Sequence, residues 1–215
     1  MDALAYLTRG GVVMIPLLLC SVLGLAIILE KSINLHRRRI LHPELVRLIH
    51  SIDSEQDIQM AKSLCKKQPG PFANIILVGL QNRHLDKAEI KELIEDQGRQ
   101  EIRSLERGLS VLEMIAGVAP LLGLLGTVIG MIKVFTVISA QGTGQASLLA
   151  GGISEALITT ATGLVIGIPI LVAYNFYTHR AEDLVLDIEK HSNAMLQRIR
   201  ALHATERQDL SATEG

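Results

Sequence analysis

The feature that most constrains this chain is a pair of long apolar segments, residues 116–138 and 148–177, joined by a short connection. Each segment exceeds the roughly 20 residues that a helix needs to cross a hydrocarbon core of about 30 Å. The connection at 139–146, SAQGTGQA, is polar but uncharged. Because backbone polar groups in lipid must be satisfied within the segment, the two runs predict a transmembrane helical hairpin.

Polar side chains lie at matching depths on the two helices of this hairpin. Counted from the connection at about 1.5 Å per residue, Thr127 and Thr160 are each roughly 18 Å deep, near the membrane midplane. Lys133 and Glu155 share a shallower level, about 9 to 10 Å from the same surface. The hairpin should therefore carry hydroxyl groups in its middle and opposite charges nearer one surface.

A third apolar run, residues 11–29, contains no charged side chain. The basic residues Arg37, Arg38 and Arg39 follow this run and no such cluster precedes it, so the positive-inside rule places the amino terminus outside and the cluster in the cytoplasm. Hydrophobic residues make up 48% of the 215 residues, but they concentrate in the three runs. This distribution excludes an ordinary globular domain, and the net charge of −1 gives no indication of nucleic-acid binding.

We therefore predict an all-α membrane protein with three transmembrane helices, the second and third extended into the cytoplasm as long helices. No stop signal is evident between Asp86 and the membrane, so we expect one continuous helix over about 86–138. The expected segments are a periplasmic amino-terminal segment at 1–10, a first transmembrane helix at 11–35, a cytoplasmic helical loop at 36–110, a second transmembrane helix at 111–138, a short periplasmic turn at 139–147, a third transmembrane helix at 148–178, a cytoplasmic helical extension at 179–202 and a flexible tail at 203–215.

Local patterns in the cytoplasmic parts predict where helices begin. Ser54 with Asp57 forms an N-cap pattern, and Asp86 with Glu89 forms a capping-box pattern. Residues 72–80 are apolar but too short to span a bilayer, so they predict a buried helix. The extension after the third span has an amphipathic pattern whose apolar stripe needs a packing partner, with residues recurring every three or four positions: Leu184, Ile188, His191, Met195, Ile199 and Leu202.

The hairpin contains two long motifs, one on each helix and in the order and spacing of a known family: APLLGLLGTVIGM at 119–131 and GISEALITTATGLVIGIP at 152–169. They resemble the MotA/TolQ/ExbB proton-channel family, and most closely its ExbB/TolQ branch. The resemblance implies a bacterial inner-membrane stator subunit that couples the proton motive force to mechanical work on a TonB-like or TolA-like envelope protein. It also implies a homopentamer that encloses the helices of an ExbD-like or TolR-like partner, a single-span protein with an aspartate in its membrane helix.

The resemblance also implies which residues line the proton pathway: Thr127, Thr160 and Glu155, with Thr159 and Thr162 as a second tier. A threonine hydroxyl both donates and accepts, which suits a relay, although in a membrane helix it often only bonds back to its own helix. An acid inside a span is a functional hypothesis by default because an unpaired charge is costly there. For Glu155, an ion pair with Lys133 at the same depth is the alternative to a pore-facing acid, and both interpretations stay open.

Small residues on the two hairpin helices predict close packing, since small side chains let helix backbones approach one another in lipid. The glycines expected in this contact are Gly123, Gly126, Gly130, Gly163 and Gly167. No Asp, Glu or His lies at the midplane beside the threonines, so no group there titrates near neutral pH. If protons cross, the titrating carboxylate must come from another chain.

The chain shows no Walker loop, no metal-ligand spacing and no nucleophile elbow, so we expect neither an enzyme nor a cofactor. Two other classes of protein compete with the proton channel. A structural membrane scaffold would explain the glycines but not Glu155. A small-solute transporter subunit would be expected to show inverted repeats or broken helices around a midplane site, and the sequence shows neither.

The predicted orientation can be tested by thiol labelling in a variant that lacks Cys20 and Cys65. A cysteine at Gly142 should react with an impermeant thiol reagent added to intact cells, because the connection is expected outside. A cysteine at Arg38 should react only after the membrane is permeabilised. Labelling of both positions in intact cells would contradict the three-span topology.

Overall fold

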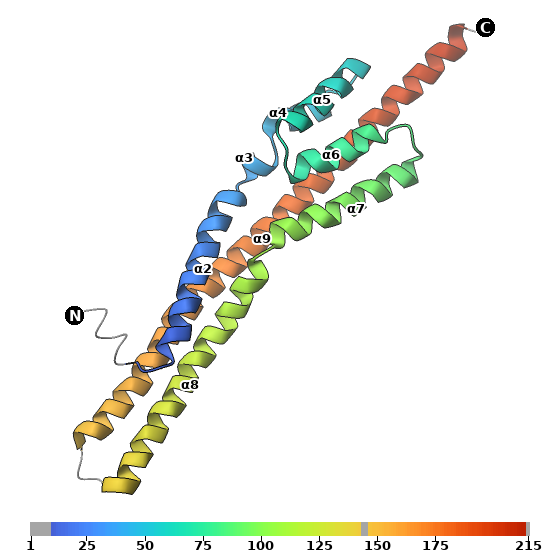
Figure 1. Cartoon of the computed structure of the whole chain (residues 1–215). Coiled ribbons are helices and arrows are strands. Elements are labelled where there is room, and N and C mark those ends of the chain that lie inside the picture. The colour runs from blue at the N-terminus through green and yellow to red at the C-terminus, as the bar shows by residue number, and fades with distance from the viewer. Residues whose placement is uncertain (1–9, 143–145, 214–215) are drawn as a thin grey trace. The chain divides into compact units, whose positions relative to one another are not determined.

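The computed structural model describes residues 10–142 and 146–213, and they form helices and no strand (Figure 1). The helices are α2 (Met14–Asn34), α3 (Arg37–Ile40), α4 (Pro43–His50), α5 (Glu55–Lys67), α6 (Pro71–Gln81), α7 (Lys87–Glu106), α8 (Leu109–Gln141) and α9 (Ala146–Thr213). The predicted all-α class is confirmed. Nearly all of the amino-terminal segment expected at 1–10, and part of the turn expected at 139–147, lie outside the described residues.

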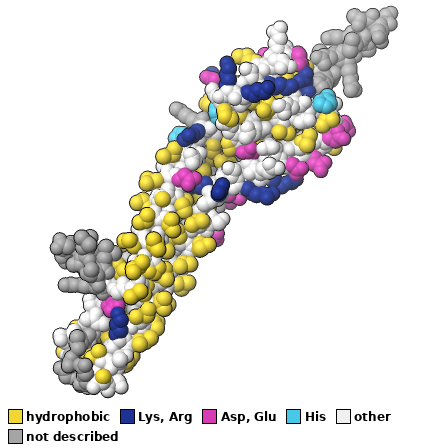
Figure 2. All heavy atoms as spheres, in the orientation of Figure 1, with side chains coloured by type: hydrophobic (Ala, Val, Ile, Leu, Met, Phe, Trp, Pro, Cys, Tyr) yellow, Lys and Arg dark blue, Asp and Glu magenta, His cyan; other side chains and the backbone are white. Residues whose placement is uncertain are grey.

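Three helical segments are long and apolar enough to cross a membrane: Met14–Asn34, Ala88–Ala140 and Leu149–Leu202. Apolar side chains on these segments face outward (Figure 2); Val165, for example, is 72% exposed and Leu157 is 65% exposed. Such surfaces are stable in hydrocarbon and unfavourable in water. The chain is a multi-pass membrane protein, as the three apolar runs predicted.

The chain divides into two compact units. The first, which we name the membrane unit, comprises Met1–Lys31 and Gly108–Tyr177; the second, which we name the loop unit, comprises Ser32–Arg107 and Thr178–Gly215. Helices α2 and α9 each contribute to both units.

In the membrane unit, α2 packs against the hairpin of α8 and α9. Val13, Met14 and Leu17 of the first span form a buried cluster with Ala119 of α8. Further along α2, the carbonyl of Ile28 accepts a hydrogen bond of 3.2 Å from the hydroxyl of Tyr177 on α9. Helix α2 therefore contacts both helices of the hairpin, and Ile166 of α9 also packs against the first cluster.

The single helix that we expected over 86–138 is in fact two helices. Helix α7 ends at Glu106 and α8 begins at Leu109, and Gly108 between them has a φ of 91°. That left-handed conformation costs other residues about 1 to 2 kcal/mol but is open to glycine. The sequence pattern concealed this break because a lone glycine can also stay helical, as Gly98 does within α7.

The loop unit begins its helices where the capping patterns predicted. The backbone N–H of Asp57 donates to the hydroxyl of Ser54 at 3.3 Å, and the N–H of Ser54 donates back to the Asp57 carboxylate at 3.0 Å. The N–H of Asp86 likewise donates to the Glu89 carboxylate at 3.4 Å. These bonds satisfy N–H groups that a helix start leaves without partners.

The apolar stripe on the extension of α9 finds its packing partner within the same chain. Leu184, Ile188, Met195 and Ile199 are buried. The apolar helix predicted at 72–80 is also buried, within α6, and a Cβ on its Gly79 would overlap the end of Met195. Helix α9 continues to Thr213, so the backbone is helical through most of the segment for which we expected a flexible tail.

Two histidines connect distant parts of the loop unit. Nε2 of His50, on α4, lies 3.0 Å from Nδ1 of His191, on α9. Burial and the neighbouring His50 lower the pKa of His191, with smaller contributions from Lys190 and Arg37, and these outweigh the opposing effect of Asp187. A hydrogen bond between two rings also needs one nitrogen without a proton, so acid should break this contact.

We predict that acid destabilises the α4–α9 contact. Because the pKa of His191 is lower in the folded chain than in the unfolded one, the folded state binds fewer protons, and its contribution to stability is lost as pH falls below the ordinary value. Hydrogen exchange of α4 amides, corrected for intrinsic rates, should be faster at about pH 5.5 than at about pH 7.5. His191→Asn should remove this difference, and His84→Asn, at an exposed site, should leave it unchanged. An acid response that persists in His191→Asn would contradict this explanation.

Candidate functional site

Helices α8 and α9 lie so close that their backbones touch. A Cβ added to Gly163 would lie 2.6 Å from the carbonyl oxygen of Ala119, and one added to Gly130 would lie 2.8 Å from that of Gly152. Carbon and oxygen atoms that are not bonded do not approach to these distances, so both positions require glycine. All the glycines expected in this contact lie in it: Gly123, Gly126, Gly130, Gly163 and Gly167.

The hydroxyls of Thr160 and Thr127 bond to consecutive carbonyls of α8. The Thr160 hydroxyl donates across the helix contact to the carbonyl of Gly123 at 3.0 Å. The Thr127 hydroxyl donates within α8 to the carbonyl of Leu124 at 2.7 Å. The two threonines do lie at one level of the hairpin, although their hydroxyls do not bond to each other. Because each hydroxyl proton is directed at a carbonyl, each oxygen keeps lone pairs with which to accept a hydrogen bond.

Among the described residues, the hydroxyls of the second-tier threonines donate to carbonyls of their own helix. Thr159 is 0% exposed, and its hydroxyl donates to the carbonyls of Glu155 and Ala156 at 3.1 and 2.9 Å. Its side chain fills the space that a Cβ on Gly126 would occupy. The Thr162 hydroxyl donates to the carbonyl of Ile158 at 2.7 Å. Thr159 thus lies within the contact of α8 and α9, whereas the neighbouring Thr160 reaches across it.

Glu155 and Lys133 lie in contact at the shallower level. The carboxylate oxygen Oε1 of Glu155 is 2.5 Å from Nζ of Lys133. The Glu155 side chain is 17% exposed and that of Lys133 is 52% exposed, so the acid is shielded and the base projects outward. The antiparallel register that places these two residues together agrees with the depths that counting from the connection predicts.

Sequence reasoning missed one neighbour of this acid. Gly11, in the turn before α2, has a φ of 66°, and a Cβ added to it would overlap Oε1 of Glu155. A pair of glycines directly before an apolar run is a signal for an unusual turn, but it does not indicate which distant side chain lies against that turn. Glu155 of α9 is therefore in contact with Lys133 of α8 and with the turn that leads into α2.

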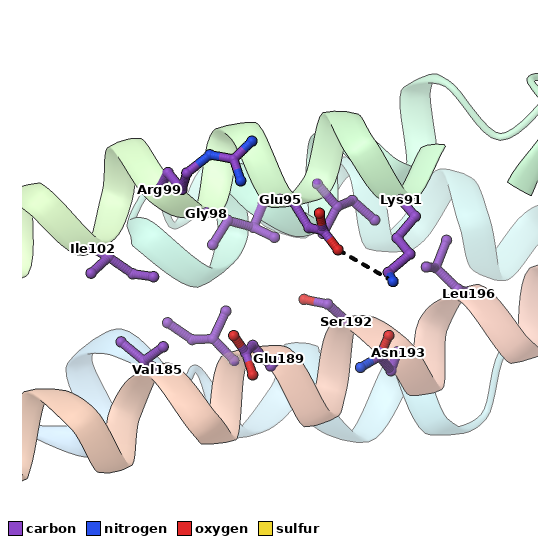
Figure 3. Close-up of a pocket in the computed structure, with 13 residues that line it drawn as sticks. Lys91, Glu95, Gly98, Arg99, Ile102, Val185, Glu189, Ser192, Asn193 and Leu196 are labelled. Atoms are coloured by element: carbon purple, nitrogen blue, oxygen red, sulfur yellow. Dashed lines mark ion pairs between the residues drawn. The ribbon is translucent and has the colours of Figure 1, made fainter. Parts of the chain in front are cut away.

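A separate cavity of about 440 Å³ lies in the loop unit between α7 and α9 (Figure 3). Isoleucines such as Ile94 and Ile188 line it, and its rim carries Lys91, which is 3.4 Å from Glu95. The hydroxyl of Ser192 is buried there without a hydrogen-bond partner among the described residues. None of the residues proposed from the sequence for the proton pathway lines this cavity, and its paired charges favour no single class of ligand.

Comparison with known proteins gives consistent matches. A model of the MotA/TolQ/ExbB proton channel family matches residues 67–190. The putative biopolymer transport protein ExbB-like 1 of Synechocystis is 34% identical over 77% of this chain, and the match spans 66% of that relative. Biopolymer transport protein ExbB of Salmonella typhimurium is 32% identical over 88% of this chain and 87% of its own length. ExbB of Neisseria meningitidis serogroup A is 28% identical over 82% of this chain and 86% of its own length.

The contact between Lys133 and Glu155 predicts energetic coupling. Lys133→Met or Glu155→Gln alone should each destabilise the protein more than both changes together, because a single change leaves one charge of the pair without its partner inside a membrane span. The half-exposed lysine limits the coupling to about 1 kcal/mol. A double-mutant cycle on the thermal unfolding of the purified protein in detergent measures this coupling, and Lys133→Arg serves as the charge-preserving control. Additive single effects would show that the pair does not act as a unit.

Proposed function

This chain belongs to the MotA/TolQ/ExbB proton channel family, and we propose that it is the proton-channel stator subunit of an inner-membrane motor of the ExbB/TolQ kind. In this role it couples the proton motive force to mechanical work on an envelope protein. The observation that carries the proposal is the pair of hydroxyls, Thr160 and Thr127, that donate to consecutive carbonyls of α8. Fixed in this way, both oxygens are available as acceptors at one depth in the membrane.

The titrating group at the midplane comes from a partner. The apolar segments 116–138 and 148–177 contain no Asp or His, and Glu155 is their one acid. A single-span partner of the ExbD or TolR kind supplies an aspartate beside the threonines. In its protonated form this aspartic acid donates a hydrogen bond to a threonine oxygen, and in its charged form it depends on hydration or a nearby cation.

Glu155 serves as the acid nearer the outer surface. A proton arriving from outside neutralises its carboxylate and weakens its attraction to Lys133, which lies 2.5 Å away. The proton then passes to the partner's aspartate at the level of Thr127 and Thr160. Thr159 is left out of this pathway because its side chain is buried between α8 and α9.

The assembly that we propose is a homopentamer that encloses the partner helices and rotates about them. The amino terminus lies in the periplasm and the loop unit in the cytoplasm, because the basic cluster at 37–39 follows the first apolar run and none precedes it. The glycine contacts of α8 and α9 make each subunit a stiff section of the ring wall.

A structural scaffold without transport is the second candidate function. The backbone contacts at Gly130 and Gly163 favour it, since they would serve any oligomer of closely packed helices. A scaffold, however, has no need for a shielded acid such as Glu155. Proton flux through vesicles that hold the chain with its partner, compared with vesicles that hold the chain alone, separates the two functions.

We predict that Thr160→Val abolishes most proton flux while the complex still assembles. Valine keeps the shape and loses one hydrogen bond to the Gly123 carbonyl, worth about 0.6 kcal/mol between membrane helices. Flux per complex should fall at least about tenfold, because the partner's aspartate loses its acceptor. Thr127→Val should act in the same direction, and Thr160→Ser should be milder.

The control for this series is Thr178→Val. The Thr178 hydroxyl is buried without a hydrogen-bond partner among the described residues, so its loss should leave proton flux per complex nearly unchanged. Flux is measured with a pH-sensitive dye inside vesicles and divided by the amount of assembled complex, because poor insertion would imitate lost conduction. Normal flux through a well-assembled Thr160→Val complex would leave that threonine as a packing residue only.

A further inference from the structure

The turn before the first span lies against the acid of the third. Gly11 precedes α2 by three residues, and its added Cβ would lie 2.9 Å from the carboxyl carbon Cδ of Glu155 and would overlap the oxygen Oε1. The N–H of Met14 donates to the carbonyl of Gly11 at 3.2 Å, so this turn leads directly into the helix. No side chain larger than hydrogen fits at this position while the Glu155 carboxylate keeps its place.

The Glu155 carboxylate has one neighbour at the start of the first span and one on the second span. The carboxylate of Glu155 lies beside the residue that leads into this end of α2. Lys133 approaches the same carboxylate from α8.

The acid of this ion pair is shielded more than the base. The Lys133 side chain is 52% exposed, so it leaves much of its own charge open, yet the Glu155 side chain is only 17% exposed. Residues 10–29 carry no charged side chain, and Lys133 and Glu155 are the charged residues of the hairpin segments 116–138 and 148–177. Within the described residues, Glu155 is thus covered by the Gly11 turn and paired with Lys133.

We propose that Gly11 is a positioning residue for Glu155: because it lacks a side chain, the turn before the first span closes over the carboxylate and holds it beside Lys133. The first span therefore takes part in controlling the outer acid of the proton path and is more than an anchor for the hairpin. The role of Glu155 in conduction rests on the proposed function, but the contact between Gly11 and Glu155 does not.

The chain offers a matched control for this test. Gly142 has a φ of 69°, almost the same as the 66° of Gly11, but a Cβ added to it would meet nothing within 4 Å. Alanine at either position is strained by the positive φ, and Gly142, with a ψ of −172°, has a conformation that is almost confined to glycine. Alanine at Gly11 also displaces the Glu155 carboxylate, whereas alanine at Gly142 does not.

Two measurements on the full-length complex in vesicles test the proposal. Gly11→Ala should lower proton flux per assembled complex about tenfold to a hundredfold, because the acid is misplaced. It should also speed the reaction of Glu155 with a membrane-permeable carbodiimide several-fold, as followed by mass spectrometry, because the displaced carboxyl group is less shielded. Gly142→Ala should leave both quantities within about twofold of the unaltered chain. Equal carbodiimide rates in Gly11→Ala and Gly142→Ala would overturn the proposal.

A second variant covers the case in which Gly11→Ala does not assemble. If the added methyl fails because it meets the carboxylate, then Gly11→Ala combined with Glu155→Ala should restore the amount of assembled complex. Failure of this double change to restore assembly would overturn the proposal. If the unaltered complex conducts no protons, the proposed function fails, but the carbodiimide rates still decide whether Gly11 positions Glu155.

Discussion

The membrane unit depends on the backbone contact between α8 and α9. In lipid, exclusion from water does not drive helices together, so close van der Waals contact and interhelical hydrogen bonds must do so. Glycine at 130 and 163 lets the two backbones approach until a single added carbon would lie within 3 Å of a carbonyl oxygen. Such a contact has one register, because a shift of either helix would press a larger side chain into the opposite backbone.

That register decides what the polar side chains can do. It brings Thr160 to a carbonyl of α8 and places Glu155 against Lys133. Adjacent residues on a helix point about 100° apart, so Thr159 and Thr160 face different surroundings. Thr159 is buried against Gly126, while Thr160 bonds across the contact and stays partly exposed. One threonine packs the hairpin, and its neighbour presents a fixed hydroxyl oxygen.

Helix α9 changes character along its 68 residues. In the membrane unit it is apolar around most of its circumference, as a lipid-facing helix must be. In the loop unit it is amphipathic, and its apolar stripe is covered by the chain's own helices. Polar contacts also stabilise that unit: the Glu101 carboxylate on α7 accepts hydrogen bonds from Asn74 of α6 at 2.8 Å and from Gln97 of its own helix at 2.9 Å.

The amino-acid sequence by itself determined the three spans, the helix starts at Ser54 and Asp86, the family and the relative depth of the hairpin residues. These properties follow from hydrophobic length, from hydrogen bonds between near neighbours and from a constant rise per residue, all of which are local. The tertiary structure alone decided where a glycine breaks a helix and which polar groups meet. Gly98 stays helical while Gly108 turns left-handed, and Gly11 lies against an acid far away in the chain. Such outcomes depend on backbone angles and on side-chain directions across a contact, and a one-dimensional pattern encodes neither.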